Sequence, residues 1–183
     1  MFAMRPSLRP LPRYRRQKEE IMKPGDILFI KTNHFVSRLI RFGQRDYGPK
    51  ASQYNHCAVY IGNAEMVEAL TKGVVRSPIS KYPASDVRIM SSLKSSLRPT
   101  VCDDLLRANA SSFARSCVGE SYGFLTIAAI AVKVLTKGEI DFGIQGTSIC
   151  SGLCARSLER LGYNFSPYDP AELTPAYLYT ILV

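Results

Sequence analysis

Cys150 has the sequence context of a nucleophile, because it follows two hydroxyl residues, Thr147 and Ser148, at the predicted start of a helix. Either hydroxyl can cap that helix by accepting a hydrogen bond from a free backbone N–H of the first turn. The positive end of the helix dipole favours an anion there, and thiolate is the reactive form of cysteine. We therefore expect a lowered pKa for Cys150. Cys154, one helical turn deeper, is expected to be a packing residue.

A cysteine nucleophile needs a base within hydrogen-bond reach and a third group that orients the base. The chain offers two histidines, His34 and His56. We favour His56, which opens a predicted strand over 55–62, as the base. His34 lies near a predicted helix start, where an exposed or capping role suffices. A single histidine on a strand is more often structural than catalytic, so His56 gains weight only together with Cys150.

Glu68 is the favoured orienting residue, since it lies on the predicted return strand over 65–70. A three-residue turn at 62–64 would pair Ala58 with Glu68 and place its carboxylate on the face of His56. A two-residue turn would move it to the opposite face, because a register slip of one residue flips every side chain. An exposed strand face would equally explain an acid at this position. Weaker candidates for the orienting role are Asp26, Asp86 and Gln145.

The elements that must position these residues follow from apolar periodicity and turn signals. Strands are predicted over 26–30, 55–62, 65–70, 73–76 and 86–90. Helices are predicted over 34–42, 100–118, 124–135 and 150–161, with one helical turn at 78–82. The segments 43–53 and 91–99 are predicted loops, and an irregular tail precedes a final apolar segment over 177–183. Strands come before most helices, which indicates an α+β fold with a small antiparallel sheet packed by helices.

Length and composition predict one globular domain. The chain has 183 residues, of which 46% are hydrophobic and 21% charged. We expect the folded domain over 23–183, preceded by a flexible basic arm over 1–22. The five cysteines are odd in number and form no CxxC pair, so we expect neither a disulfide framework nor a zinc site, and no cofactor. Free cysteines favour a reducing compartment.

The net charge of +9 is concentrated partly in the arm over 1–22. Such an arm can dock on an anionic surface or within a larger assembly, although a solvated tail is the simpler interpretation. No sequence-specific recognition of nucleic acid is expected. The N-terminus carries no apolar signal-peptide core, and the longest apolar run, over 124–135, is too short to cross a bilayer. We therefore expect a cytoplasmic protein, with association with a virion or release by lysis as the alternative.

Several short motifs resemble those of one known family in their order and spacing. The pattern H-x-x-x-Y-x-G occurs over 56–62, Val-Glu-Ala over 67–69, and the Cys-Ser-x-Leu-x-x-Arg helix over 150–156, with Gly152 where that family commonly has Glu. Together they resemble the circularly permuted NlpC/P60 group. These are permuted papain-like cysteine hydrolases of the YiiX/YaeF type, related to lecithin retinol acyltransferase-like proteins. In that group the histidine strand precedes the cysteine helix, as it does here.

The resemblance covers about residues 23–178 and implies a Cys150–His56–Glu68 triad that attacks an acyl carbon. It implies a cysteine amidase or peptidase that acts through an acyl-enzyme, for instance on peptidoglycan-type peptides. A lipid acyl hydrolase or acyltransferase could use the same triad. The alternative from another class is a non-catalytic structural component of a larger assembly, such as a virion, anchored by its basic arm.

Overall fold

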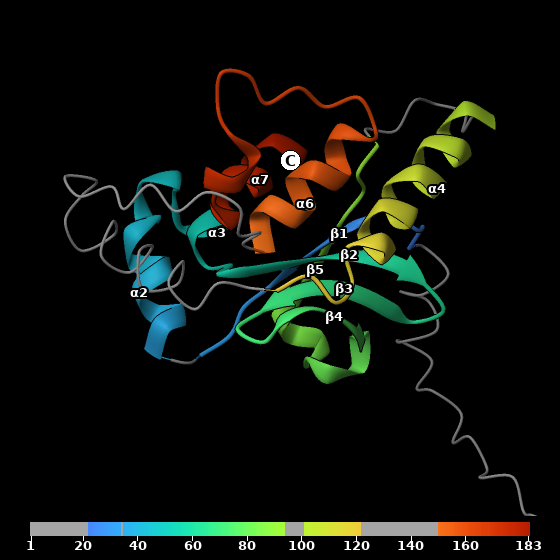
Figure 1. The fold of residues 1–183 in the computed structure, drawn as a ribbon. Helices are drawn as coiled ribbons and strands as arrows, with labels where there is room; N and C mark the ends of the chain where they lie inside the picture. Colours follow the sequence, from blue (N-terminus) through green and yellow to red (C-terminus); the bar gives the residue numbers. More distant parts are fainter. Residues whose placement is uncertain (1–21, 34, 94–100, 122–149) are drawn as a thin grey trace, which may run out of the picture.

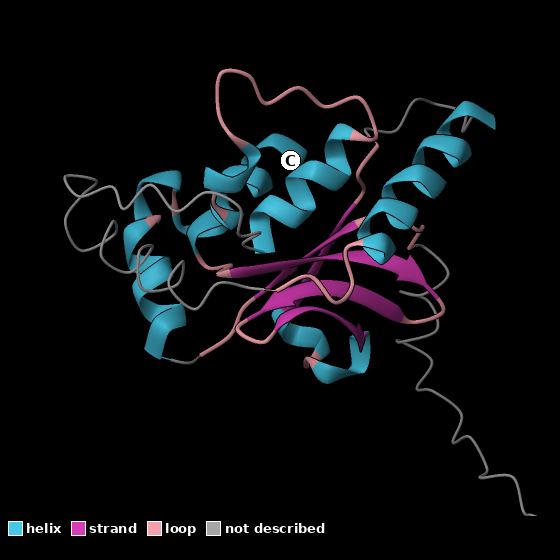
Figure 2. Ribbon diagram, viewed as in Figure 1, coloured by secondary structure: helices cyan, strands magenta, loops and turns pink. Residues whose placement is uncertain are grey.

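The computed structural model describes residues 22–33, 35–93, 101–121 and 150–183. This part of the chain is a mixed α+β structure built on a five-stranded antiparallel sheet with the strand order β4-β3-β2-β1-β5 (Figures 1 and 2). The strands are β1 (Ile27–Ile30), β2 (His56–Gly62), β3 (Glu65–Leu70), β4 (Gly73–Pro78) and β5 (Val87–Met90). The α+β expectation is therefore confirmed.

In the described ranges, helices lie between and after the strands. The α-helices in the described ranges are α2 (Phe35–Gly43), α3 (Pro49–Ser52), α4 (Val101–Ser116), α6 (Cys150–Glu159) and α7 (Pro175–Leu182). Short 3₁₀ turns are η1 (Arg45–Tyr47), η2 (Ile79–Lys81), η3 (Ala84–Asp86) and η4 (Pro170–Glu172). Figure 1 shows α4, α6 and α7 on one side of the sheet and the segment containing η2 and η3 on the other.

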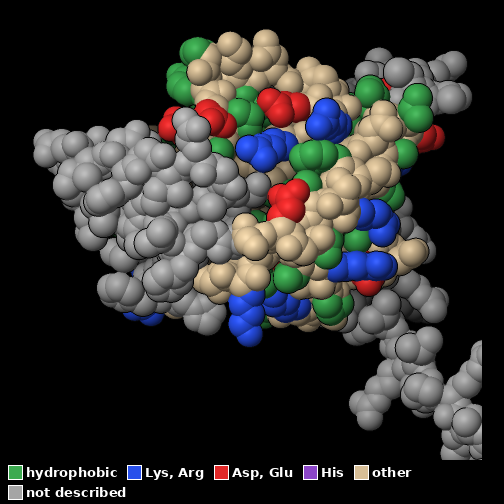
Figure 3. Space-filling view, in the orientation of Figure 1, with side chains coloured by type: hydrophobic (Ala, Val, Ile, Leu, Met, Phe, Trp, Pro, Cys, Tyr) green, Lys and Arg blue, Asp and Glu red, His purple; other side chains and the backbone are tan. Residues whose placement is uncertain are grey.

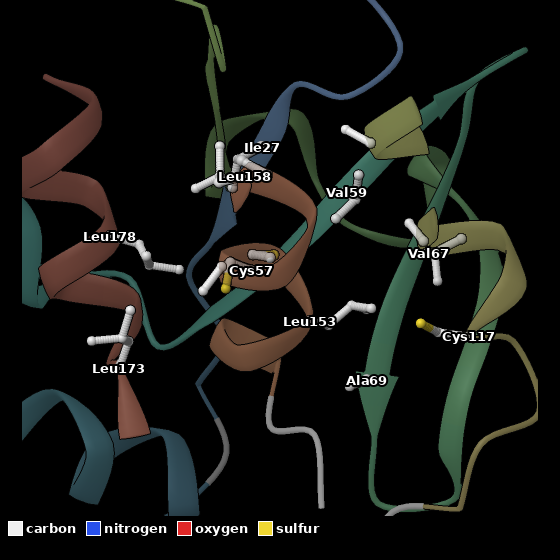
Figure 4. Close-up of a cluster of buried hydrophobic side chains, with 14 of the residues drawn as sticks. Ile27, Cys57, Val59, Val67, Ala69, Cys117, Leu153, Leu158, Leu173 and Leu178 are labelled. Atoms are coloured by element: carbon white, nitrogen blue, oxygen red, sulfur yellow. The ribbon is translucent and has the colours of Figure 1, made fainter. Parts of the chain in front are cut away.

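Both faces of the sheet are buried at its centre, since all four residues of β1 and the first six of β2 are buried. On the face of α6, the sheet side chains pack against helix residues that include Leu153 and Leu158 (Figure 4). The sheet contributes Ile27, Phe29, Cys57, Val59, Ile61, Val67 and Ala69 to this core. The opposite face contributes Leu28, Ile30, Ala58, Tyr60 and Met66 to a second core, which also contains Met22 and is flanked by Ile79 and Tyr82.

The β2–β3 hairpin combines a tight turn with a β-bulge. Asn63 and Ala64 form a two-residue turn with positive φ values of 54° and 57°. Gly62 pairs with Glu65, but after an irregularity between Tyr60 and Gly62 the register becomes Ala58 with Glu68. A two-residue turn alone would place Glu68 on the wrong face. The bulge adds one residue to β2 and restores the pairing that the sequence predicted from a three-residue turn.

A buried ion pair joins β1 to α4. Arg107 Nη1 donates to Asp26 Oδ1 at 2.5 Å, and both side chains are at most 9% exposed. Asp26 also accepts hydrogen bonds from the backbone N–H groups of Lys23 and Ser92. Asp26 is thereby committed to holding the fold together and does not serve as the orienting acid.

The predicted strands all form, with ends that differ by at most two residues from those expected. Two of the predicted irregular regions are wrong. The segment 43–53 contains η1 and α3, and the tail ends in α7, whose start is capped by the Thr174 hydroxyl accepting from Tyr177 N. Pro49 and Pro175 occupy the first helical position, where the missing N–H costs nothing. The basic arm up to residue 21 and the predicted helix over 124–135 lie outside the described residues.

Candidate active site

His56 and Glu68 meet across the hairpin as the predicted register requires. His56 Nε2 lies 2.8 Å from Glu68 Oε2, and the side chain of Glu68 is 0% exposed. Glu68 pairs with Ala58, so its side chain leaves the same face of the sheet as that of His56. The alternative explanation, an acid on an exposed strand face, is wrong.

Cys150 reaches the same histidine from α6. It is the first residue of that helix, and His56 is the first residue of β2, so their contact is made where both elements begin. The two side chains interact closely enough for each to shift the pKa of the other, and the Cys150 side chain is partly exposed. The structure thus brings together all three residues that the sequence singled out, from a strand, its hairpin partner and a helix.

Charges on the histidine and the acid stabilise each other. Burial alone would lower the pKa of His56, but the charge and hydrogen bond of Cys150, followed by those of Glu68, raise it to about 9. Burial alone would raise the pKa of Glu68, yet its hydrogen bond to His56, the His56 charge, and bonds from Lys81 and Ser77 lower it to about 2. Around neutral pH the pair is therefore an imidazolium bound to a carboxylate.

The expectation of a lowered pKa for Cys150 is wrong. The largest cause is a hydrogen bond to the Cys57 side chain, and with burial and the Cys57 charge it raises the pKa of Cys150 well above its usual value. His56 acts in the opposite direction and lowers it, but the other effects outweigh this attraction. A helix start does not activate a thiol that a second thiol and burial hold in the protonated form.

Three site-adjacent residues were missed by sequence reasoning: Cys57, Lys81 and Tyr82. Strand alternation correctly placed Cys57 on the core face of β2, but nothing in the sequence indicated that its thiol meets Cys150. Lys81 and Tyr82 both lie within the predicted helical turn over 78–82. In the structure Lys81 ends η2 and Tyr82 directly follows it, and both side chains donate to the Glu68 carboxylate. A basic and an aromatic residue in a short turn carry no pattern that predicts such contacts.

The remaining candidates have other places. Cys154 is fully buried in the α6 core, as predicted for a packing residue. Asp86 ends η3, where its carboxylate accepts from Ser85 at 3.5 Å. The other predicted participants lie outside the described residues: His34, Gln145, Thr147 and Ser148.

Within the described ranges, no group of three or more His, Cys, Asp or Glu side chains has an arrangement that could hold a metal ion. In the described part of the face drawn in Figure 3, Lys and Arg side chains alternate with acidic and uncharged residues. None of the helices in the described ranges is both long and apolar enough to cross a membrane.

Comparison with known proteins gives no family assignment. No protein-family model matches the chain, and no curated protein matches its sequence significantly. The chemistry of this site must therefore be argued from its own geometry.

Proposed function

We propose that the protein is a thiol hydrolase of the permuted NlpC/P60-like type, with Cys150 as nucleophile, His56 as base and Glu68 as the orienting acid. One observation carries the proposal. His56 Nε2 lies 2.8 Å from a fully buried carboxylate, and the Cys150 thiol at the start of α6 interacts with the same histidine and raises its pKa. This is the nucleophile–base–orienter arrangement that covalent acyl transfer requires.

The reaction would proceed through a thioester. His56 takes the proton of Cys150, and the Sγ atom attacks the acyl carbon to form a tetrahedral oxyanion. The free backbone N–H groups at the start of α6 would stabilise that oxyanion. The imidazolium then protonates the leaving amine as its bond to carbon breaks. Water attacks the thioester, passes a proton through His56, and releases the acid while Cys150 regains its proton.

We propose a peptide amide as the substrate bond, of the kind found in cell-wall peptides. A lipid ester or amide fits the same three side chains, so both classes belong in the test. Purified peptidoglycan and phospholipid vesicles would be incubated with the protein, and released amino groups or fatty acids would be quantified. Release from peptidoglycan supports the peptide substrate, whereas release from the vesicles alone overturns it in favour of a lipid.

The catalytic proposal itself is tested by mass spectrometry of the intact protein. A p-nitrophenyl ester should leave one acyl group on the wild-type chain, and peptide mapping should locate it on Cys150. Cys150→Ala should remove both the adduct and the turnover. Cys117→Ala is the matched control, since Cys117 directly follows α4 and interacts with Ser116 and Glu120 instead. An adduct that persists in Cys150→Ala, or equal labelling of all thiols, contradicts the proposal.

A further inference from the structure

The Glu68 carboxylate has a second cationic neighbour, and its two oxygens are divided between the neighbours. Lys81 Nζ donates to Oε1 at 2.6 Å. Oε2 lies 2.8 Å from His56 Nε2 and accepts from the Tyr82 hydroxyl at 2.7 Å. The oxygen that faces the histidine is thus fixed from one side by Tyr82, while the lysine occupies the other oxygen.

The burial of Glu68 makes this lysine electrostatically necessary. A fully buried carboxylate is costly unless a positive charge compensates it, and the Glu68 side chain is 0% exposed. His56 supplies that charge only while it is protonated. Of the four side chains that the described structure places on Glu68, from His56, Ser77, Lys81 and Tyr82, the lysine is the one that stays cationic when the imidazole becomes neutral.

The fold fixes Lys81 through the same hairpin that carries the triad residues. Ile79 N, at the start of η2, donates to Ala64 O in the β2–β3 turn at 2.9 Å, and Tyr82 N closes η2 onto Ile79 O at 3.2 Å. Lys81 Nζ also lies 5.3 Å from the centre of the Tyr82 ring, within the range of a cation–π contact. Its side chain is 37% exposed, so the ammonium retains contact with water while it binds the buried acid.

We propose that Lys81 is a positioning residue. Its permanent positive charge keeps Glu68 ionised while His56 gains and loses its proton. Because Lys81 binds Oε1, it leaves Oε2 to His56 and Tyr82. The catalytic meaning of this role rests on the proposed function, but the electrostatic role does not. His56 faces Glu68 from β3, Tyr82 directly after η2 and Cys150 from α6, while Lys81 binds the other oxygen of the same Glu68 carboxylate. Because the lysine charge opposes the imidazolium, His56 should release its proton more readily than it would beside Glu68 alone.

The test is the titration of His56 by NMR, which needs no substrate. The chain has two histidines, so the two ring Cε1–Hε1 signals are assigned with one His56→Gln variant, and the His34 signal is an internal reference. Lys81→Gln keeps a hydrogen-bond donor but removes the charge. It should move the His56 midpoint up by roughly one pH unit, and Lys81→Arg should bring the midpoint back. Lys72→Gln, at an exposed lysine in the β3–β4 turn, is the matched control and should leave it unmoved.

A His56 midpoint that stays in place or falls in Lys81→Gln overturns the proposal, even if Cys150 is shown to form an acyl-enzyme. A raised midpoint in a protein that forms no acyl-enzyme overturns the hydrolase function and supports the charge role of Lys81. If Lys81→Gln alone does not fold, the double variant Glu68→Gln/Lys81→Gln should regain the fold, because no buried charge is then uncompensated. Failure of the double variant to fold also overturns the proposal.

Discussion

At the scale of single residues, the proton balance of the Cys150–His56 pair decides when the site can react. The pKa of His56 is about 9, and that of Cys150 is raised well above its usual value. Around neutral pH the pair is therefore a thiol beside an imidazolium, and it must lose one proton before the thiol can attack. Loss of one proton gives either thiol with imidazole or thiolate with imidazolium, and these two forms interconvert by transfer within the pair. Both forms are competent for nucleophilic attack, so the first proton loss sets the pH dependence.

We expect kcat/KM to rise with pH toward an apparent midpoint of about 9. Cys57→Ala should move this midpoint to lower pH and speed alkylation by iodoacetamide at neutral pH by about tenfold. The reason is that the Cys57 thiol is the largest cause of the raised Cys150 pKa.

The alkylation prediction is checked by the pH dependence of carbamidomethylation at Cys150. Cys154→Ala is the control, because it removes a thiol of equal burial that is not the first cause of the Cys150 shift. A bell-shaped wild-type profile centred near neutral pH, or an unchanged midpoint in Cys57→Ala, would show that the two thiols are not coupled as described.

At the scale of secondary-structure elements, the β2–β3 hairpin does most to assemble the site. Its register pairs Ala58 with Glu68, and its turn anchors η2 and thereby Lys81. The turn uses Asn63 and Ala64 with positive φ at both positions. Asparagine tolerates that region well, whereas alanine pays a steric cost that glycine avoids.

Ala64→Gly should therefore raise the free energy of unfolding by up to about 1 kcal/mol, since relief of the left-handed strain exceeds the entropy that glycine adds to the unfolded chain. The measurement is urea denaturation followed by circular dichroism. Ala108→Gly provides the same chemical change at an exposed position inside α4, where it should lower stability by about 1 kcal/mol. Loss of stability in both variants would contradict the turn conformation.

The sequence predicted the elements of this hairpin but left the face of Glu68 open, since a three-residue turn places it opposite Ala58 and a two-residue turn does not. The structure has the two-residue turn, and the Ala58–Glu68 pairing arises from the bulge. The bulge could not be predicted from the amino-acid sequence, because one extra residue in a strand changes neither the composition nor the apolar period of that strand. The same holds for contacts that depend on tertiary approach, such as Cys57 with Cys150 or Lys81 with Glu68.

At the scale of the whole molecule, the sheet is held between two cores, and a buried ion pair crosses one of the layers. Asp26 in the β1 region and Arg107 on α4 are both almost fully buried, and Ser91 and Ser92 add hydrogen bonds to the guanidinium. The Tyr163 hydroxyl donates to Ser92 O at 2.9 Å, which extends this network to the segment after α6. One network therefore links the sheet, α4 and the segment after α6.

Arg107→Met should lower the free energy of unfolding by about 3–5 kcal/mol, because it leaves the Asp26 carboxylate buried without its counter-ion. Thermal and urea denaturation would measure the loss. Arg76→Met is the matched control, since Arg76 pairs with Glu65 at the surface, where an ion pair contributes less than about 1 kcal/mol. Equal losses in the two variants would mean that the buried pair does not hold α4 to the sheet.

The irregularity between Tyr60 and Gly62 decides which face of the sheet carries the Glu68 side chain. Many side chains can replace those of the turn without moving Glu68, because no turn side chain determines the face of the sheet on which Glu68 lies. With the same turn and a regular ladder in place of the bulge, by contrast, Ala58 would pair with Ala69, and the acid would lie opposite Val59 and turn toward α6. The hairpin would keep its strands and its hydrogen bonds, yet His56 would lose its partner. One bulged residue thus decides whether the hairpin brings the Glu68 carboxylate to His56.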